Sequence, residues 1–192
     1  MVVLADLPDP EPPLRVLFVC TANISRSPYA ERRAALLLAE TGGDRATVAS
    51  AGIPGVPGRD MDPQMAAQLR VRGVDPNGHV SRSVTHDLLM SSALVLTFEL
   101  THRVRLTTTW PDQAIKVFGL RQFADALARV PSPGRGLELL DQVYAMSRPD
   151  GLDADFPDPY RRGAAAARES AAQIDAVLER IIPALAGRGR PR

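Results

Sequence analysis

Residues 14–31 read LRVLFVCTANISRSPYAE, and they predict a strand, a loop and a helix in succession. Residues 14–20 form a β-branched, mostly apolar run, which predicts a strand buried on both faces. After a polar turn, Ser27 and Pro28 are expected to start a helix, because serine is a common N-cap and proline fits the first helical turn. Gly42-Gly43 is expected to end that helix.

The order of strand and then helix recurs along the rest of the chain. Further strands are expected at residues 46–50, 93–97 and 115–118. Four further helices are expected: one at 62–73, one that begins near 99, one that follows the strand at 115–118 and ends near 127, and one that begins near 163. Strands that alternate with helices favour a parallel sheet with right-handed crossovers and helices on both faces. The expected fold class is therefore α/β, a three-layer sandwich around a central four-stranded parallel sheet.

Two terminal segments and one internal segment depart from this order. Residues 1–13 hold four prolines among acidic residues, which predicts a flexible leader, and residues 187–192 form a short basic tail. Residues 14–186 form the predicted domain. Within it, residues 131–157 are rich in proline and glycine around a short helix expected in 137–146. We interpret this segment as an insert with the hypothetical role of a lid or docking element.

Composition and charge exclude several classes of protein. The 192 residues carry 23 basic and 22 acidic side chains, and this net charge of +1 argues against a role in coating nucleic acid. No apolar run reaches about 18 residues, so no membrane span is expected. The N-terminus lacks the pattern of a signal peptide. The single cysteine excludes an intramolecular disulfide and a cysteine-based zinc site, and it favours a reducing cytoplasm.

The segment that carries chemical information is the Cys20–Arg26 loop. Cys20 ends the first predicted strand, at the edge where open α/β sheets bind ligands. A loop between a strand and a helix N-terminus directs its N–H groups toward an anion, and the Arg26 guanidinium suits two phosphate oxygens. These positive surroundings are expected to lower the pKa of the Cys20 thiol and make it a nucleophile. A lone cysteine can also be a small core residue, but the combination of strand, loop and helix favours the nucleophile.

Residues 20–31 resemble the phosphate-binding loop of low-molecular-weight protein tyrosine phosphatases, Cys-x-Gly-Asn-x-x-Arg-Ser-Pro-x-Ala-Glu. Further shared motifs are Ser50-Ala51-Gly52, Asp62-Pro63, GHVSR at 78–82 and Asp158-Pro159-Tyr160. The stretches VPGR at 56–59 and LTFE at 96–99 are most similar to bacterial members associated with exopolysaccharide and capsule synthesis. The resemblance implies a cytoplasmic hydrolase that needs no metal and no cofactor. It also implies phosphotyrosine proteins as substrates, a bacterial tyrosine kinase among them, and inorganic phosphate as product and inhibitor.

The resemblance also implies a role for each matching residue. Cys20 attacks phosphorus to form a phosphocysteine, Arg26 binds the phosphoryl oxygens, and Asp158 acts as general acid and then as base. The implied phosphate-binding residues are Thr21, Ala22, Asn23, Ile24, Ser25 and Arg26; the supporting residues are Ser27, Ser50 and His79; the substrate-pocket residues are Ile24 and Tyr160. Asn23 is expected to adopt a left-handed backbone conformation, and Ser27 to hydrogen-bond the cysteine sulfur.

The assignment of the acid has competitors in the sequence. Asp153 and Asp155 lie close to Asp158, and Asp158-Pro159 can also be a simple turn. The family pattern favours Asp158, which directly precedes the Pro-Tyr pair. Tyr160 can equally be a buried tyrosine that packs against the loop.

Three residues depart from the family pattern, and three other functions stay open. Ala22 replaces the usual glycine, Ala93 an aspartate and Ile53 a threonine, which puts catalytic efficiency and substrate preference in question. The alternatives are an arsenate reductase of the same fold, a protein-arginine phosphatase and a weakly active phosphoprotein-binding module. The missing second cysteine argues against thioredoxin-coupled arsenate reductases; single-cysteine versions that use a small thiol stay possible, although they typically carry Arg-Ser-Gln where this chain has Ser27-Pro28 after Arg26. Ile24 in place of a threonine argues against an arginine phosphatase. The joint presence of Cys20, Arg26 and Asp158 argues against a binding module.

Overall fold

A computed structural model describes residues 13–42, 45–149, 151 and 154–187. The expected leader, apart from Pro13, and the basic tail, apart from Gly187, lie outside the described residues. No helix in the described ranges is both long and apolar enough to cross a membrane.

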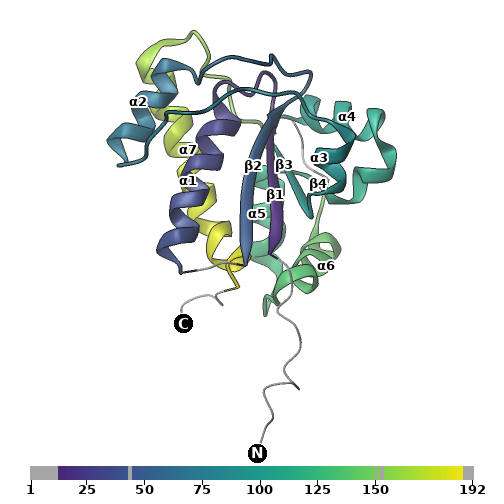
Figure 1. Cartoon of the computed structure of the whole chain (residues 1–192). Helices are drawn as coiled ribbons and strands as arrows, with labels where there is room; N and C mark the ends of the chain where they lie inside the picture. The colour runs from purple at the N-terminus through teal and green to yellow at the C-terminus, as the bar shows by residue number, and fades with distance from the viewer. Residues whose placement is uncertain (1–12, 43–44, 150, 152–153, 188–192) are drawn as a thin grey trace, which may run out of the picture.

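Four parallel strands form the sheet at the centre of the molecule (Figure 1). They are β1 (Leu14–Cys20), β2 (Ala46–Gly52), β3 (Leu94–Thr97) and β4 (Val117–Gly119), in the order β2-β1-β3-β4. β1 occupies the middle, pairing Phe18 with Ser50 on one side and with Leu96 on the other. The predicted four-stranded parallel sheet is confirmed. The carboxyl ends of β1 and β3 consequently lie side by side at one edge.

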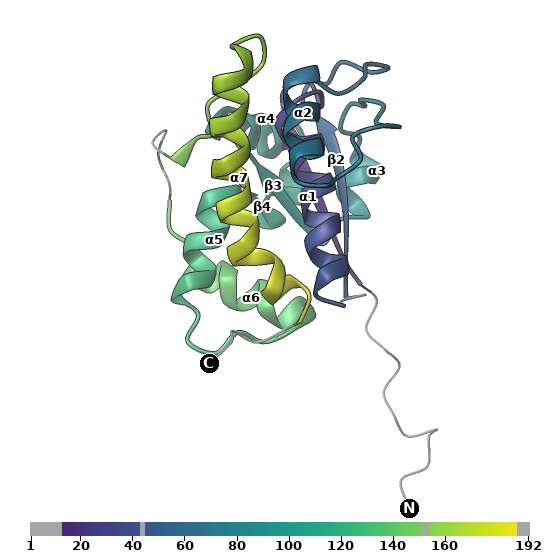
Figure 2. The ribbon, with the colours of Figure 1, turned by 90° about the vertical axis from the view of Figure 1, so that its left-hand side faces the viewer.

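Helices cover both faces of the sheet: Figure 1 shows one group on each side of the strands, and Figure 2 looks onto one of these groups. They are α1 (Arg26–Glu40), α2 (Pro63–Val71), α3 (His86–Met90), α4 (Leu100–Thr109), α5 (Leu120–Arg129), α6 (Gly136–Met146) and α7 (Gly163–Leu185). β1 contributes side chains to two separate hydrophobic cores, because successive side chains of a strand point to opposite faces of the sheet. Val16 and Phe18 pack with α1, α5 and α7, whereas Leu17 and Val19 pack with α3 and α4. The fully apolar strand predicted from the sequence is explained by this burial on two sides.

The start of α1 differs from the prediction. The helix begins at Arg26, and Ser25 occupies the N-cap position without a side-chain cap hydrogen bond. Ser27, which was expected to start the helix, lies inside its first turn, and its hydroxyl group contacts Cys20. The interior of the site uses this hydroxyl, so it is not available to cap the helix.

The helix within residues 131–157 lies away from the Cys20–Arg26 loop, and the lid or docking role of the segment stays a prediction. Its helix α6 packs into the main core through Leu139 and Val143, both fully buried. In Figure 1, α6 lies at the end of the sheet opposite the carboxyl end of β1. The chain then returns toward that end, where the Phe156 ring packs edge-on against Phe98 at 5.6 Å between centroids. The segment is thus part of the core at one end and part of the site at the other.

Two short helical segments were not predicted from the sequence. These segments are α3, which spans five residues, and a 3-10 helix at Pro111–Lys116. Because of the 3-10 helix, β4 begins at Val117, two residues later than predicted. Segments this short carry too little periodicity to be recognised. α7 includes Pro183 and ends two residues later, at Leu185.

Candidate active site

The Cys20–Arg26 loop turns its carbonyl groups outward. The carbonyl oxygens of residues 20–24 accept hydrogen bonds, at 2.7–3.3 Å, from Ile53 N, Gly55 N, Val56 N, His79 Nε2 and Asp62 N respectively. In a trans peptide the next N–H points opposite to the carbonyl, so the N–H groups of residues 21–25 point inward. Among the described residues, no hydrogen bond engages these five N–H groups. The loop therefore offers a ring of unused donors around one position, which suits an anion.

Asn23 holds the loop in this shape. It adopts a left-handed conformation with φ of 59°, which asparagine tolerates better than most residues. Its Nδ2 donates to Ser50 Oγ at 2.8 Å and to Ser27 Oγ at 3.0 Å, and its Oδ1 accepts from Arg82 N at 2.9 Å. His79 donates to the backbone carbonyl of Asn23 at 2.7 Å. The structure thus brings Ser50 and His79 together beside Asn23.

The backbone conformation at Ala22 permits the alanine that replaces the glycine of the family pattern. Ala22 is not among the described residues with positive φ, so its Cβ causes no backbone strain there. Gly52, in contrast, allows no side chain: a Cβ at this position would lie 2.7–2.8 Å from backbone atoms of Thr21, Ala22 and Asn23. The end of β2 therefore supports the loop by direct backbone contact.

Cys20 is buried at the base of the loop, with 2% of its surface exposed. Its Sγ lies 3.0 Å from Ser27 Oγ. That hydroxyl accepts a hydrogen bond from Asn23 Nδ2, so its own proton is available to the sulfur or to the Ala51 carbonyl at 3.3 Å. The shorter contact, to a larger atom, favours the sulfur. A hydroxyl that donates to Sγ stabilises a thiolate when it forms or departs.

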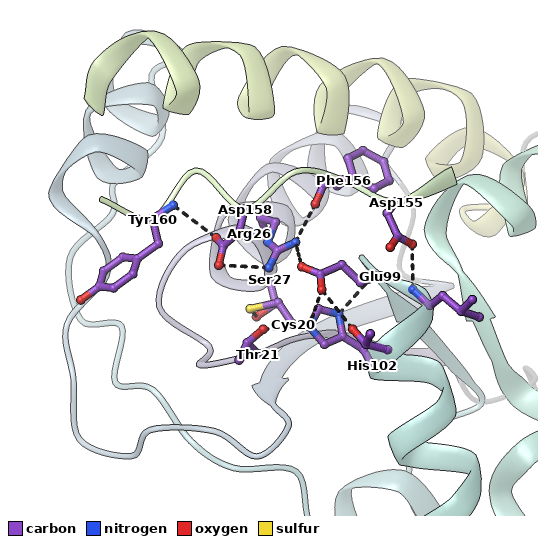
Figure 3. Close-up of polar contacts among 12 residues, drawn as sticks. Cys20, Thr21, Arg26, Ser27, Glu99, His102, Asp155, Phe156, Asp158 and Tyr160 are labelled. Atoms are coloured by element: carbon purple, nitrogen blue, oxygen red, sulfur yellow. Dashed lines mark hydrogen bonds and ion pairs between the residues drawn. The ribbon is translucent and has the colours of Figure 1, made fainter. Parts of the chain in front are cut away.

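The Arg26 side chain is buried, with 1% of its surface exposed, and it contacts three other residues. Its Nη1 donates to Glu99 and, at 2.6 Å, to the Phe156 carbonyl, and its Nη2 lies 3.3 Å from Asp158 Oδ2 (Figure 3). Its Nε is buried and has no partner among the described residues. In a guanidinium group, Nε–H and one Nη2–H lie along one edge of the plane, and the Nε–H on this edge of Arg26 is the donor without a partner among the described residues. That edge is the one that binds an oxyanion with two parallel hydrogen bonds.

Glu99 and His102 complete the site, and sequence reasoning missed both. Glu99 precedes α4 at the end of the β3 segment, next to the end of β1. Burial raises its pKa, but the Arg26 charge and hydrogen bond outweigh burial and hold the pKa below its ordinary value. His102 Nε2 lies 2.9 Å from Thr21 Oγ1, and burial lowers the pKa of His102 to about 4. The available signal was an acidic residue placed just after the strand beside β1.

The two candidate acids that the structure describes, Asp155 and Asp158, have different partners. Asp155 Oδ1 accepts a hydrogen bond from Leu100 N at 2.7 Å and so caps α4, whereas Asp158 contacts Arg26. Asp153 lies outside the described residues. The Tyr160 backbone N donates to Asp158 Oδ1 at 3.2 Å, which holds this carboxylate in a turn. Of the two candidate acids that the structure describes, Asp158 is therefore the one that lies beside the guanidinium, where Glu99 also lies.

The two expected pocket residues are placed differently. Ile24 is buried within the loop, with 8% of its surface exposed. The Tyr160 ring points away from Cys20 and Arg26 in Figure 3, and the Arg161 guanidinium lies over it at 5.1 Å from the centroid. The described residues contain no group of three or more His, Cys, Asp or Glu side chains that could hold a metal ion.

The fold and the site define a class of protein. It has a parallel α/β sheet and an anion-binding loop between β1 and α1, with a cysteine at the base of the loop and an arginine at its end. Comparison with known sequences then identifies the family. The profile described as "Low molecular weight phosphotyrosine protein phosphatase" matches residues 15–147. The chain belongs to this family. The matched region ends before Asp158, so the proposed role of that residue rests on the Asp-Pro-Tyr motif and on the geometry.

Individual relatives agree with this assignment. The chain is 31% identical over 132 residues to the low molecular weight protein-tyrosine-phosphatase Etp of Escherichia coli, covering 68% of this chain and 85% of the relative. It resembles a solved low molecular weight protein tyrosine phosphatase from T. tengcongensis with a TM-score of 0.71 and 25% identity, over 88% of this chain and 97% of that one. The YwlE arginine phosphatase from Geobacillus stearothermophilus has a TM-score of 0.69 at 22% identity, over 88% and 91% of the two chains. This last likeness shows the fold alone.

Proposed function

We propose that this protein hydrolyses phosphotyrosine in proteins through a phosphocysteine intermediate on Cys20. The observation that carries the proposal is the loop itself. Five N–H groups and one edge of Arg26 converge above a buried sulfur that a serine hydroxyl contacts. This arrangement binds the three equatorial oxygens of a phosphoryl group in transfer. The tyrosine-phosphatase names of the relatives support the choice of substrate.

In the first step, the Cys20 thiolate attacks phosphorus and an S–P bond forms as the P–O bond to the tyrosine breaks. Asp158 gives its proton to the departing phenolate oxygen. Arg26 and the loop N–H groups neutralise the charge on the equatorial oxygens. Ser27 donates a hydrogen bond to the sulfur and so stabilises the thiolate, which is the leaving group of the second step.

In the second step, water attacks the phosphorus of the phosphocysteine. Asp158, now ionised, takes a proton from that water, the S–P bond breaks, and inorganic phosphate is released. Phosphate is then both a product and an inhibitor, because it fits the same loop. We also propose a cytoplasmic location and, as the family resemblance implies, a bacterial tyrosine kinase as a protein substrate.

A parallel assay separates this function from its alternatives. A phosphotyrosine peptide, phosphoarginine and arsenate with a small thiol are offered to the wild-type protein, with Cys20→Ser as the matched control. We expect turnover of the phosphotyrosine peptide, no turnover by Cys20→Ser, and phosphate binding by both. Preferred hydrolysis of phosphoarginine would transfer the assignment to that substrate, and turnover by Cys20→Ser would exclude the cysteine mechanism.

A further inference from the structure

The contacts of His102 define where its proton lies. This side chain is 2% exposed, and both of its ring nitrogens have partners. Nδ1 lies 3.1 Å from the backbone N of Glu99, and Nε2 lies 2.9 Å from Thr21 Oγ1. A backbone N–H can only donate, so Nδ1 accepts and carries no proton.

The ring is therefore neutral with its proton on Nε2. Burial lowers the pKa of His102 to about 4; the neighbouring Glu99 charge opposes this shift and the Arg26 charge adds to it. A neutral imidazole with a bare Nδ1 must carry N–H at Nε2. His102 consequently donates to the Thr21 hydroxyl, and that hydroxyl accepts.

The Thr21 hydroxyl has one proton, and the contact with His102 does not use it. Among the described residues, Thr21 Oγ1 has no hydrogen-bond acceptor. Thr21 is exposed, directly follows Cys20, and contributes one of the inward N–H groups of the loop. Its hydroxyl proton is thus left for a ligand at the loop opening.

We propose that the Thr21 hydroxyl donates a hydrogen bond to an oxygen of the tetrahedral anion bound in the Cys20–Arg26 loop, and that His102 is the positioning residue that sets this direction. The proposal goes beyond the loop amides, because it adds a side-chain donor that carries no charge. Its catalytic consequence rests on the proposed function, whereas its consequence for anion binding does not.

Such a donor matters here because the charge of Arg26 is already shared. The guanidinium contacts both Glu99 and Asp158, so two carboxylates compete with a bound phosphate for it. A neutral hydroxyl adds a hydrogen bond to the anion without this competition. A hydrogen bond to a charged group of this kind corresponds to roughly 10- to 100-fold in affinity.

The first test compares Thr21→Val with Thr21→Ser. The affinity for inorganic phosphate is measured by calorimetry, and kcat/KM is measured with a phosphotyrosine peptide. We expect Thr21→Val to lose roughly 10- to 100-fold in both quantities and Thr21→Ser to stay within about 3-fold of the wild type. The matched control is Thr107→Val, which removes a hydroxyl that bonds the Arg103 backbone carbonyl within α4. Phosphate affinity unchanged in Thr21→Val would overturn the proposal.

The second test asks whether His102 acts through Thr21. We expect His102→Gln to weaken phosphate binding, and the double variant with Thr21→Val to bind no worse than Thr21→Val alone. Fully additive losses would show that His102 has an independent structural role. Thermal melting of each variant, together with the Thr21→Ser result, separates loss of the donor from loss of the fold.

The third test observes the proton directly. The chain has three histidines, so the ¹⁵N ring resonances of His102 are assigned by their loss in His102→Gln. Between about pH 5.5 and 8 we expect a protonated Nε2 and a bare Nδ1. The opposite tautomer would overturn the inference. Neither this spectrum nor phosphate binding needs turnover, so a failure of the phosphatase assay would leave both results readable.

Discussion

Nη2 of Arg26 and Oδ2 of Asp158 lie 3.3 Å apart, so the guanidinium and the carboxylate meet at one corner of the site (Figure 3). The arginine side chain is buried, whereas 43% of the Asp158 side chain is exposed. Asp158 thus lies on the solvent side of the group proposed to bind phosphate. This is the position from which an acid can reach a departing oxygen.

The first prediction concerns Asp158 as the proton donor. In Asp158→Ala, kcat for a phosphotyrosine peptide should fall by roughly 10²–10⁴-fold, because the phenolate must leave without a proton. An aryl phosphate with a strongly acidic phenol should lose much less. Steady-state kinetics on the two substrates measures the difference.

Asp155→Ala is the matched control for that experiment. Asp155 caps α4 through Leu100 N, so its loss should lower the free energy of unfolding by about 1 kcal/mol. It should not make kcat depend on the leaving group. Equal losses on both substrates in Asp158→Ala would mean that Asp158 positions the loop and does not donate the proton.

The second prediction concerns the contact between Gly52 and the loop. In Gly52→Ala, the new Cβ would lie 2.7–2.8 Å from three backbone atoms of the loop, closer than carbon atoms approach in proteins. The loop must move, so phosphate affinity and kcat/KM should both fall by at least roughly 10-fold, since misplacement by about 1 Å costs about 10²-fold. Calorimetry with phosphate and a phosphotyrosine assay measure these two quantities. Ala22→Gly, which adds no atom, should bind phosphate normally.

Much of this architecture follows from the sequence, and the limits are physical. The strands were predictable because residues such as Phe18 and Val19 are buried on opposite faces, which leaves a continuous apolar run. Asn23 and Asp158 were predictable from local motifs. Glu99 and His102 were not, because their partners Arg26 and Thr21 are more than seventy positions away and meet them only through strand order.

The start of α1 and the position of α6 also depend on tertiary packing, which a local sequence pattern does not show. Ser27 looks like a helix cap in sequence, yet the buried Cys20 uses its hydroxyl. Residues 136–146 look like part of an insert, yet two fully buried side chains, Leu139 and Val143, make this segment a piece of the core. Packing decides both cases, and no local pattern reports it.

The third prediction concerns acid stability. Burial lowers the pKa of His102 to about 4 from an ordinary value of 6.5. The unfolded chain therefore takes up a proton below pH 6.5 that the folded protein refuses until about pH 4. Above pH 6.5, His102 therefore causes no loss in the free energy of unfolding. As the pH drops from 6.5 toward 4, this residue lowers that free energy by up to about 3 kcal/mol.

Urea unfolding of the wild type and of His102→Gln between pH 7 and 4 measures this contribution. The variant should lose less stability over the range, although Glu99, whose pKa is lowered by Arg26, adds a separate acid-sensitive contribution to both proteins. His86→Gln is the control, because His86 is an exposed histidine paired with Asp112 on the surface. Identical pH slopes for the wild type and His102→Gln would contradict the prediction.

The fourth prediction concerns oxidation of Cys20. Peroxide converts the thiolate to a sulfenic acid with release of hydroxide, and a second thiol normally captures that species as a disulfide. This chain has one cysteine, and the buried Ser25 shares the loop with it. Without a resolving thiol, further peroxide oxidises the sulfenic acid to the irreversible sulfinic acid. Prolonged peroxide treatment should therefore inactivate the protein permanently, and bound phosphate should slow the loss because it covers the sulfur.

Ser25→Cys should make the inactivation largely reversible by dithiothreitol, as activity recovery and the mass of the intact protein would report. Full recovery of the wild type after prolonged exposure, with no thiol present during treatment, would show that another group protects Cys20.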